Sequence, residues 1–128
     1  MNPPELRYSE SHEWVRAEDT TATIGITFHA QDQLGDVIFV SLPDAGSTVR
    51  QFEKMGEIES VKTVSDLISP ISGEVIARND QLEARPELVN ESPYDKGWLL
   101  KVRLDDTAQL DKLMTAEQYE QLVGETSK

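Results

Sequence analysis

The feature of the sequence that most constrains its fold is a succession of short β-forming segments, each closed by a turn signal. Valine, isoleucine, threonine and aromatic residues gather in these segments. Gly, Pro, Asn and Asp separate them, as at residues 43–46. We expect strands or hairpins over residues 13–17, 21–26, 36–42, 48–56, 56–68, 73–78 and 98–104. Many short strands with few helices predict a mainly β domain, built as two small packed sheets or a flattened barrel.

The few helices that the sequence predicts lie at the periphery. Thr27 has the side chain of an N-cap, and it predicts a short helix that runs to about Leu34 and is closed by Gly35. Residues 81–85 predict a helical turn. Residues 86–97 contain two prolines and a glycine, and we expect them to form an ordered surface loop.

Two more helices are predicted near the C-terminus. Asp105 and Asp106 precede a short segment with leucines on one face, which predicts a capped helix. Thr115 and Gln118 have the spacing of a capping box that opens a final helix. We expect Gly124 to end that helix. The expected core contacts on it are Tyr119, Leu122 and Val123.

Composition limits what the chain can bind. Its 128 residues are enough for one domain with a modest core. A net charge of −12 disfavours nucleic acid and anionic membranes and favours basic clefts on partner proteins. No apolar run approaches the roughly 18 residues that a membrane span needs. Residues 1–5 resemble neither a secretory signal nor a transit peptide, so we expect a cytoplasmic protein.

The side chains offer little chemistry of their own. The chain has no cysteine, which excludes disulfides, a thiol nucleophile and a cysteine metal site. His12 and His29 lie 17 residues apart, without the spacing of a zinc site or a catalytic triad. We therefore interpret both as structural or surface residues, and we predict no catalytic residue and no metal ligand. Any redox or thiol chemistry must come from an attached group.

Lys62 is the residue most suited to carry such a group. It is the only cation in residues 55–77, and it lies in the turn of the hairpin expected over residues 56–68. A lone turn lysine is usually just a solvated charge. Here, however, Val61 and Thr63 flank it in place of the usual turn residues, and a second turn and strand follow at residues 69–75. The pattern predicts one amine at the apex of a structured hairpin.

The segment resembles the lipoylation segment of the H protein of the glycine cleavage system, through Glu59-Ser60-Val61-Lys62, Ser65-Asp66 and Pro70-Ile71-Ser72-Gly73-Glu74-Val75. Further motifs match that family in order and spacing: Ser11-His12-Glu13-Trp14-Val15, Ala22-Thr23-Ile24-Gly25-Ile26-Thr27, Ala30-Gln31, Leu34-Gly35-Asp36, Phe39-Val40, Leu42-Pro43, Pro86-Glu87-Leu88-Val89-Asn90, Pro93-Tyr94 and Gly97-Trp98. The resemblance covers about residues 6–123.

The resemblance implies a fold, a cofactor and a site. The fold is the barrel-sandwich hybrid of lipoyl and biotinyl domains, with short peripheral helices and a C-terminal helix, as a single lipoyl-carrier domain over residues 1–128. The cofactor is lipoic acid, attached covalently to Lys62. The residues that flank this lipoylation site are Glu59, Ser60, Val61 and Asp66. The cleft that holds the loaded arm is assigned to Ser11, Glu13 and Asp66.

The resemblance also implies the partners of a carrier that catalyses nothing itself. The chain would shuttle the aminomethyl group of glycine from a pyridoxal-phosphate glycine decarboxylase (P protein) to a folate-dependent aminomethyltransferase (T protein). Electrons would then pass to dihydrolipoyl dehydrogenase (L protein). Lipoate-attaching enzymes would modify Lys62, and the carrier is expected to be a monomer that binds neither nucleic acid nor membrane.

Four alternatives stay open. A relative could use its lipoyl arm in another pathway, as a lipoate-binding or lipoyl-relay protein. A biotin carrier would have Met on both sides of the lysine, where this chain has Val61 and Thr63. A lipoyl domain of a 2-oxo acid dehydrogenase would have Asp before the lysine and a linker to further domains. The fourth alternative is an unmodified structural or adaptor domain.

Overall fold

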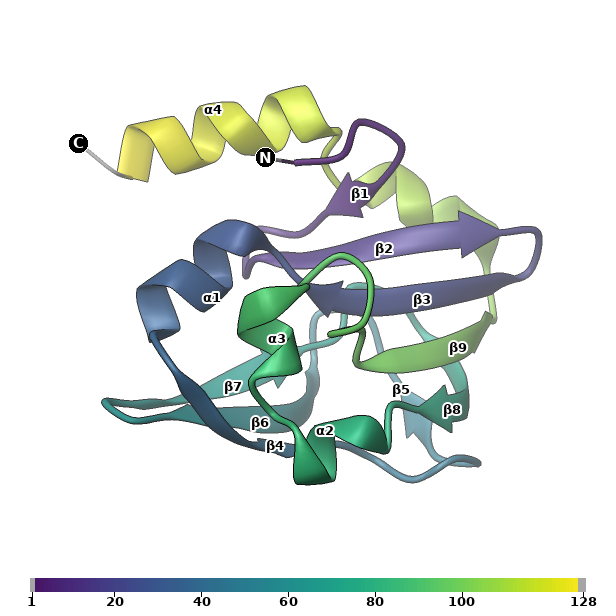
Figure 1. The fold of residues 1–128 in the computed structure, drawn as a ribbon. Helices are drawn as coiled ribbons and strands as arrows, with labels where there is room; N and C mark the ends of the chain where they lie inside the picture. Colours follow the sequence, from purple (N-terminus) through teal and green to yellow (C-terminus); the bar gives the residue numbers. More distant parts are fainter. Residues whose placement is uncertain (1, 127–128) are drawn as a thin grey trace.

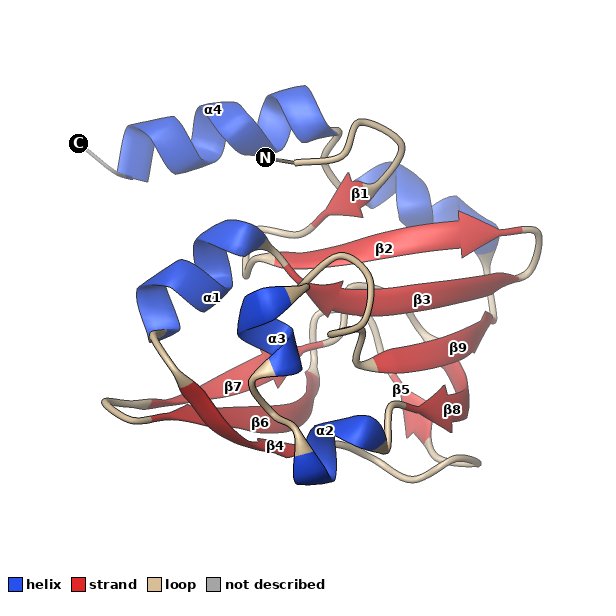
Figure 2. Cartoon of the chain, viewed as in Figure 1, coloured by secondary structure: helices blue, strands red, loops and turns tan. Residues whose placement is uncertain are grey.

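The computed structural model describes residues 2–126 as two antiparallel sheets with short helices around them (Figures 1 and 2). The six-stranded sheet has the order β1-β2-β3-β9-β8-β5, and the three-stranded sheet has the order β4-β6-β7. The strands are β1 Arg7–Tyr8, β2 Glu13–Glu18, β3 Thr21–Ile26, β4 Val37–Ser41, β5 Thr48–Val49, β6 Lys54–Ser60, β7 Val64–Ile68, β8 Gly73–Arg78 and β9 Leu100–Leu104. The helices are α1 Phe28–Leu34, α2 Gln81–Ala84, α3 Leu88–Glu91, the 3₁₀ helix η1 Thr107–Lys112 and α4 Ala116–Thr126.

The main core lies between the two sheets. Alternate residues of β3, β6, β7, β8 and β9 point into it, which is the period-two burial of half-buried strands. Fully buried members include Ile24, Ile58, Leu67, Val75 and Val102. Because the sheets share one apolar interior, the mainly β, two-sheet architecture expected from the sequence is confirmed.

A second apolar cluster fixes the C-terminal helix to the six-stranded sheet. Tyr119 of α4 stacks on Tyr8 of β1 with ring centroids 4.9 Å apart, and both side chains are fully buried. Trp14 of β2 is also buried there, and its indole Nε1 donates to the carbonyl of Pro93 at 3.0 Å. The N-terminal strand and the last helix, far apart in sequence, therefore lie side by side (Figure 1).

The capping signals in the sequence produce the helices that were expected from them. The Thr27 hydroxyl accepts from the amide of Ala30 at 3.1 Å and caps α1, and Gly35 closes that helix with φ of 80°. At the start of α4, Thr115 and Gln118 exchange the two bonds of a capping box, at 3.0 and 3.2 Å. These local predictions are confirmed.

Three boundary predictions are wrong. Residues 48–56 do not form one strand, because Phe52 adopts φ of 66° and the chain turns there, which places β5 and β6 in different sheets. The expected surface loop at 86–97 contains α3. The last helix continues past Gly124 to Thr126, because that glycine keeps a helical conformation and not the left-handed one of a C-terminal cap.

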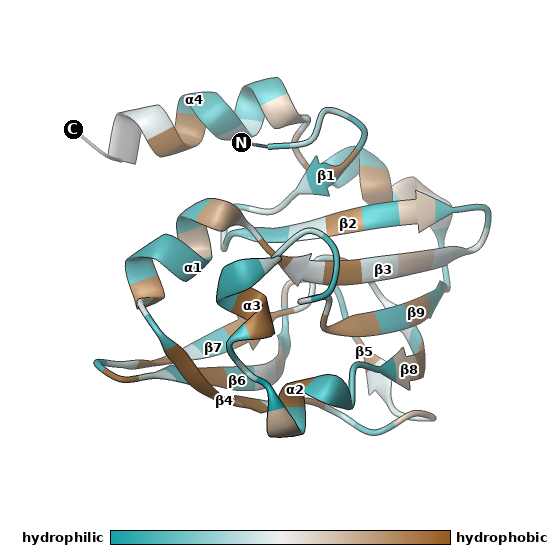
Figure 3. Cartoon of the chain, in the orientation of Figure 1, coloured by the Kyte–Doolittle hydropathy of each residue, from teal (hydrophilic) through white to brown (hydrophobic). Residues whose placement is uncertain are grey.

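The outer face of the three-stranded sheet is unusually apolar near one end. Strand β4 is almost wholly apolar in the colouring of Figure 3. Its Phe39 is paired with Glu59 of β6, which is paired in turn with Val64 of β7. Phe39 and Val64 are more than half exposed, at 58% and 57%. None of the helices among residues 2–126 is long and apolar enough to cross a membrane.

Candidate functional site

The β6–β7 hairpin carries Lys62 at its tip. Ser60 organises the turn: its amide donates to the carbonyl of Thr63 at 2.8 Å, and its hydroxyl accepts from the amides of Lys62 and Thr63 at 3.3 and 3.2 Å. Ser60 is buried, whereas Lys62 is exposed. The side chain that closes the turn is thus fixed, while the amine is presented to solvent.

The tip of the hairpin is held by the segment between α1 and β4. The amide of Val61 donates to the carbonyl of Asp36 at 3.0 Å. A Cβ placed on Gly35 would lie 3.5 Å from Lys62 Cε, so the aliphatic stem of the lysine passes over that glycine. The base of the Lys62 side chain is therefore positioned from two sides, by its own turn and by the end of α1.

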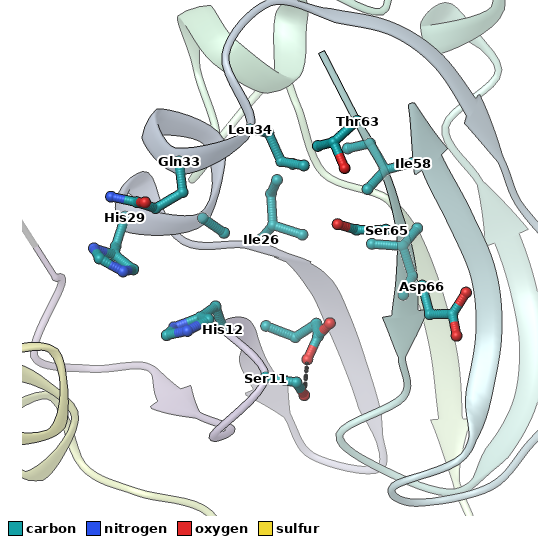
Figure 4. Close-up of a pocket in the computed structure, with 13 residues that line it drawn as sticks. Ser11, His12, Ile26, His29, Gln33, Leu34, Ile58, Thr63, Ser65 and Asp66 are labelled. Atoms are coloured by element: carbon teal, nitrogen blue, oxygen red, sulfur yellow. Dashed lines mark hydrogen bonds between the residues drawn. The ribbon is translucent and has the colours of Figure 1, made fainter. Parts of the chain in front are cut away.

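A cavity of about 670 Å³ opens beside the hairpin, between α1, the start of β2 and strands β6 and β7 (Figure 4). Its apolar lining comes from both sheets and from α1: Ile26, Ala30, Leu34, Ile58 and Leu67. Its polar lining includes Ser11, His12, Glu13, His29 and Ser65. The lining reaches from Thr63, next to Lys62, to the two histidines. An arm attached to Lys62 would find this cavity next to its root.

Glu13 is the buried acid of the cavity, with 1% of its surface exposed. Its Oε1 accepts from the hydroxyls of Ser9 and Ser11 at 2.8 and 2.5 Å, and its Oε2 accepts from the amide of Ile68 at 3.1 Å. Burial raises the pKa of Glu13 to about 7, although these hydrogen bonds oppose the rise. All of these donors are neutral, so a cation that entered the cavity would supply the missing counter-charge.

Two histidines that the sequence did not connect meet at the cavity. The rings of His12 and His29 lie 4.9 Å apart, and both line the cavity (Figure 4). Nδ1 of His12 is 2.7 Å from the hydroxyl of Tyr119. Burial, followed by the proximity of His29, lowers the pKa of His12. Their separation of 17 residues gave no signal, because the contact depends on the turn before β2 and on the position of α1.

Asp66 lies close to the cavity but turns its carboxylate away from it (Figure 4). Lys54 contacts Asp66 at 3.3 Å and Glu57 at 2.8 Å on the outer face of the sheet. Because side chains alternate along a strand, both neighbours of Asp66, Ser65 and Leu67, face inward and line the cavity. The structure therefore brings Ser11 and Glu13 together and does not bring the Asp66 carboxylate to them.

The other residues expected at the hairpin are close to Lys62 but differ in exposure. Glu59 lies on the outer face, between Phe39 and Val64, and Val61 is exposed beside the lysine. Within residues 2–126 the structure contains no cluster of three or more His, Cys, Asp or Glu side chains able to hold a metal ion.

Comparison with known proteins agrees with this geometry. The family model described as glycine cleavage H-protein matches residues 6–126. The chain is 53% identical over 123 residues to the glycine cleavage system H protein of Staphylococcus carnosus, covering 96% of this chain and 98% of the relative. It is 56% identical to that of Brevibacillus brevis, with the same coverage. A crystal structure of a glycine cleavage system H protein from Mycobacterium marinum superimposes with a TM-score of 0.89 at 38% identity, covering 95% of this chain and 98% of the other.

Two packed β-sheets with a lysine on an exposed hairpin define a barrel-sandwich protein of the lipoyl-domain type. The fold expected from the resemblance is thereby confirmed. The chain belongs to the glycine cleavage H-protein family, the carrier subunits of that system.

Proposed function

We propose that this chain is a single lipoyl-carrier domain that bears its arm on Lys62 and serves the glycine cleavage system. It carries the aminomethyl group of glycine from the P protein to the T protein, and electrons to the L protein. The observation that most supports this role is the exposed amine of Lys62 beside a cavity of about 670 Å³. A lipoyl group, when bound, supplies a disulfide to a chain that has no cysteine of its own.

The residues around Lys62 fit such a group. The amine is exposed on a turn that Ser60 and Asp36 hold in place, so an attaching enzyme meets a fixed backbone. The cavity next to it has apolar walls that suit an aliphatic chain, and it contains one buried carboxylate. The chain thus offers an attachment point and a shelter within one unit.

In this proposal the chain's own residues bind the loaded arm and keep water from it. Glu13 carries the negative charge that the protonated amine of an aminomethyl cargo requires, and Ser9 and Ser11 fix the orientation of that carboxylate. Ile26, Leu34 and Ile58 supply apolar walls of the same cavity. Since a charge interaction is strengthened where water is excluded, these walls make the single carboxylate effective.

The carrier itself performs no catalysis in this account. Its net charge of −12 suits docking to basic surfaces of the P, T and L proteins and of a lipoate-attaching enzyme. The alternative, a relay that passes lipoate to other carriers, uses the same hairpin and cavity.

Intact mass and reconstitution test the proposal. Protein from lipoate-replete cells should carry one lipoyl group, which Lys62→Arg removes and Lys54→Arg, on the same hairpin, keeps. Lipoylated wild-type protein with P, T and L proteins should support glycine-dependent reduction of NAD. Persistent lipoylation of the Lys62→Arg variant would refute the site. Lipoylation without any glycine-dependent turnover would favour the relay alternative.

A further inference from the structure

Tyr119 connects the C-terminal helix to the wall of the cavity through a chain of buried polar groups. Its hydroxyl is 2.7 Å from Nδ1 of His12 and 2.7 Å from the hydroxyl of Thr27. The Thr27 hydroxyl also accepts from the amide of Ala30, in the first turn of α1. Thr27 and Tyr119 are both fully buried. One phenol therefore touches the His12 ring and the residue that starts α1.

The direction of the bonds along this chain follows from counting donors and acceptors. The Thr27 oxygen accepts the amide proton of Ala30. The hydroxyl proton of Thr27 also needs an acceptor, and among the contacts of Thr27 within residues 2–126 the Tyr119 oxygen is the atom that can accept it. Burial raises the pKa of Tyr119 to about 12, so the phenol keeps its proton at neutral pH. That proton is then donated to Nδ1 of His12. In this arrangement every buried hydroxyl proton has an acceptor, as buried polar groups require.

A nitrogen that accepts this bond cannot itself carry a proton. Nδ1 of His12 is therefore unprotonated, and the ring proton of the neutral form is on Nε2. A proton added to Nδ1 would force Tyr119 to become the acceptor, and one buried hydroxyl proton would lose its partner. The hydrogen bonds from Thr27 through Tyr119 to His12 thus favour the neutral form of His12, in addition to the effect of its burial.

We propose that Tyr119 is a positioning residue that holds His12 in the neutral tautomer with its proton on Nε2, so that the lining of the cavity contains a neutral imidazole and not a cation. The titratable groups that face the His12 ring are His29 from α1 and Tyr119 from α4, and Glu13 lines the same cavity. Tyr8 lies behind Tyr119 in the stack.

The proposal extends the function suggested above and rests on it in one respect, the positive charge of the cargo. A protonated amine near Glu13 would be repelled by an imidazolium in the same cavity. His29 already lies beside His12, so protonation of both rings would place two like charges 4.9 Å apart by ring centroid. By keeping His12 neutral, Tyr119 leaves the negative charge of Glu13 free to attract the cargo, with no repulsion of the cargo by His12.

The test uses Tyr119→Phe with Tyr8→Phe as its matched control. Each variant removes one buried phenol oxygen from the same ring stack, but only Tyr119 contacts His12, since the Tyr8 hydroxyl donates to the carbonyl of Pro3 at 2.6 Å. The chain has only two histidines, so their ring nitrogens can be followed by ¹⁵N NMR in untagged protein without a lipoyl group. The wild type should show His12 protonated on Nε2 only. Tyr119→Phe should give a mixture of tautomers and raise the pH at which His12 titrates, and Tyr8→Phe should do neither.

A second pair of variants tests the direction of the chain. Thr27→Ser keeps the hydroxyl and should keep the wild-type tautomer. Thr27→Ala removes only a donor to the Tyr119 oxygen, so the Tyr119 proton keeps Nδ1 of His12 as its acceptor and the wild-type tautomer should persist. A change of tautomer in Thr27→Ala would show that the bonds run in the opposite direction, from His12 through Tyr119 to Thr27. The proposal is overturned if His12 of the wild type carries its proton on Nδ1, or if Tyr119→Phe and Tyr8→Phe change His12 equally. Because the measurements use the unmodified chain, their outcome is independent of whether Lys62 is lipoylated.

Discussion

The amide of Ile68 donates to Oε2 of Glu13 at 3.1 Å, and this bond joins the end of β7 to the start of β2. The two residues are 55 positions apart and belong to different sheets. A titratable group thus bridges the halves of the fold at the floor of the cavity. Its protonation state affects both the stability of the fold and the charge that the cavity presents.

Stability should fall as the pH rises toward neutrality. The pKa of Glu13 is raised by burial from 4.5 to about 7, so between these values the folded state binds more protons than the unfolded state. Over that window the free energy of unfolding should fall by about 3 kcal/mol from this group. Urea unfolding followed by tryptophan fluorescence from pH 4 to 8 measures it. Glu13→Gln should flatten the dependence in this window, and an identical pH profile in both proteins would contradict the assignment.

The loaded arm should be protected mainly by Glu13. A hydrogen bond to a charged group contributes roughly 1.5–3 kcal/mol. Glu13→Gln should therefore speed ammonia release from purified aminomethylated protein by about tenfold to a hundredfold, if release of the arm limits breakdown. Asp66→Asn is the matched control, because that carboxylate contacts Lys54 on the outer face and should change the rate little. Equal acceleration in both variants would mean that Asp66 reaches the arm.

Local signals in the sequence predicted the elements whose causes are local. The Thr27 cap, the closing Gly35 and the Thr115–Gln118 capping box all form as expected, because each bond joins residues a few positions apart. The break between β5 and β6 was missed because Phe52 is not a residue type expected at positive φ. Helix α3 was missed because prolines and a glycine surround a segment of only four residues.

The candidate site was predictable only in part, because many of its contacts join residues that are far apart in the sequence. Lys62 and its turn could be found from one segment, and the resemblance led to Ser11 and Glu13. The pairing of His12 with His29, and the contact of His12 with Tyr119 over 107 positions, have no local signature. The outward orientation of Asp66 could be deduced only once the strand register was known, since a shift by one residue would reverse it.

Two glycines should respond to the same substitution with opposite signs. A Cβ on Gly25 would clash with Cζ2 of Trp14, in the packing of the second cluster. Gly25→Ala should lower the free energy of unfolding by about 1–3 kcal/mol and alter the Trp14 fluorescence. Gly124 lies in α4 with nothing within 4 Å of an added Cβ, so Gly124→Ala should raise stability by up to about 1 kcal/mol. Denaturant titration measures both, and a neutral Gly25→Ala would show that Trp14 can move.

Docking to partners should weaken with salt. The chain has a net charge of −12, and exposed charges are screened beyond about 8 Å at physiological ionic strength. The affinity of the lipoylated protein for glycine decarboxylase, measured from 20 to 500 mM salt, should fall steadily. Glu59→Gln, on the hairpin, should reduce this slope more than Glu117→Gln on α4. A flat dependence in the wild type would indicate that apolar contacts such as Phe39 dominate.

The hydrogen bond from the amide of Val61 to the carbonyl of Asp36 limits the volume that a group attached to Lys62 could explore. Because the hairpin tip is bonded to the backbone between α1 and β4, an arm attached to Lys62 would pivot at the lysine side chain and not on a swinging loop. An arm on a fixed hairpin is a shorter tether than an arm on a mobile loop. The free end of the arm is then confined to a smaller volume, which raises its effective concentration at the nearby cavity. Under the proposed function, weak contacts inside the cavity would then suffice to retain the cargo, and a partner that competes for it would have little binding energy to overcome.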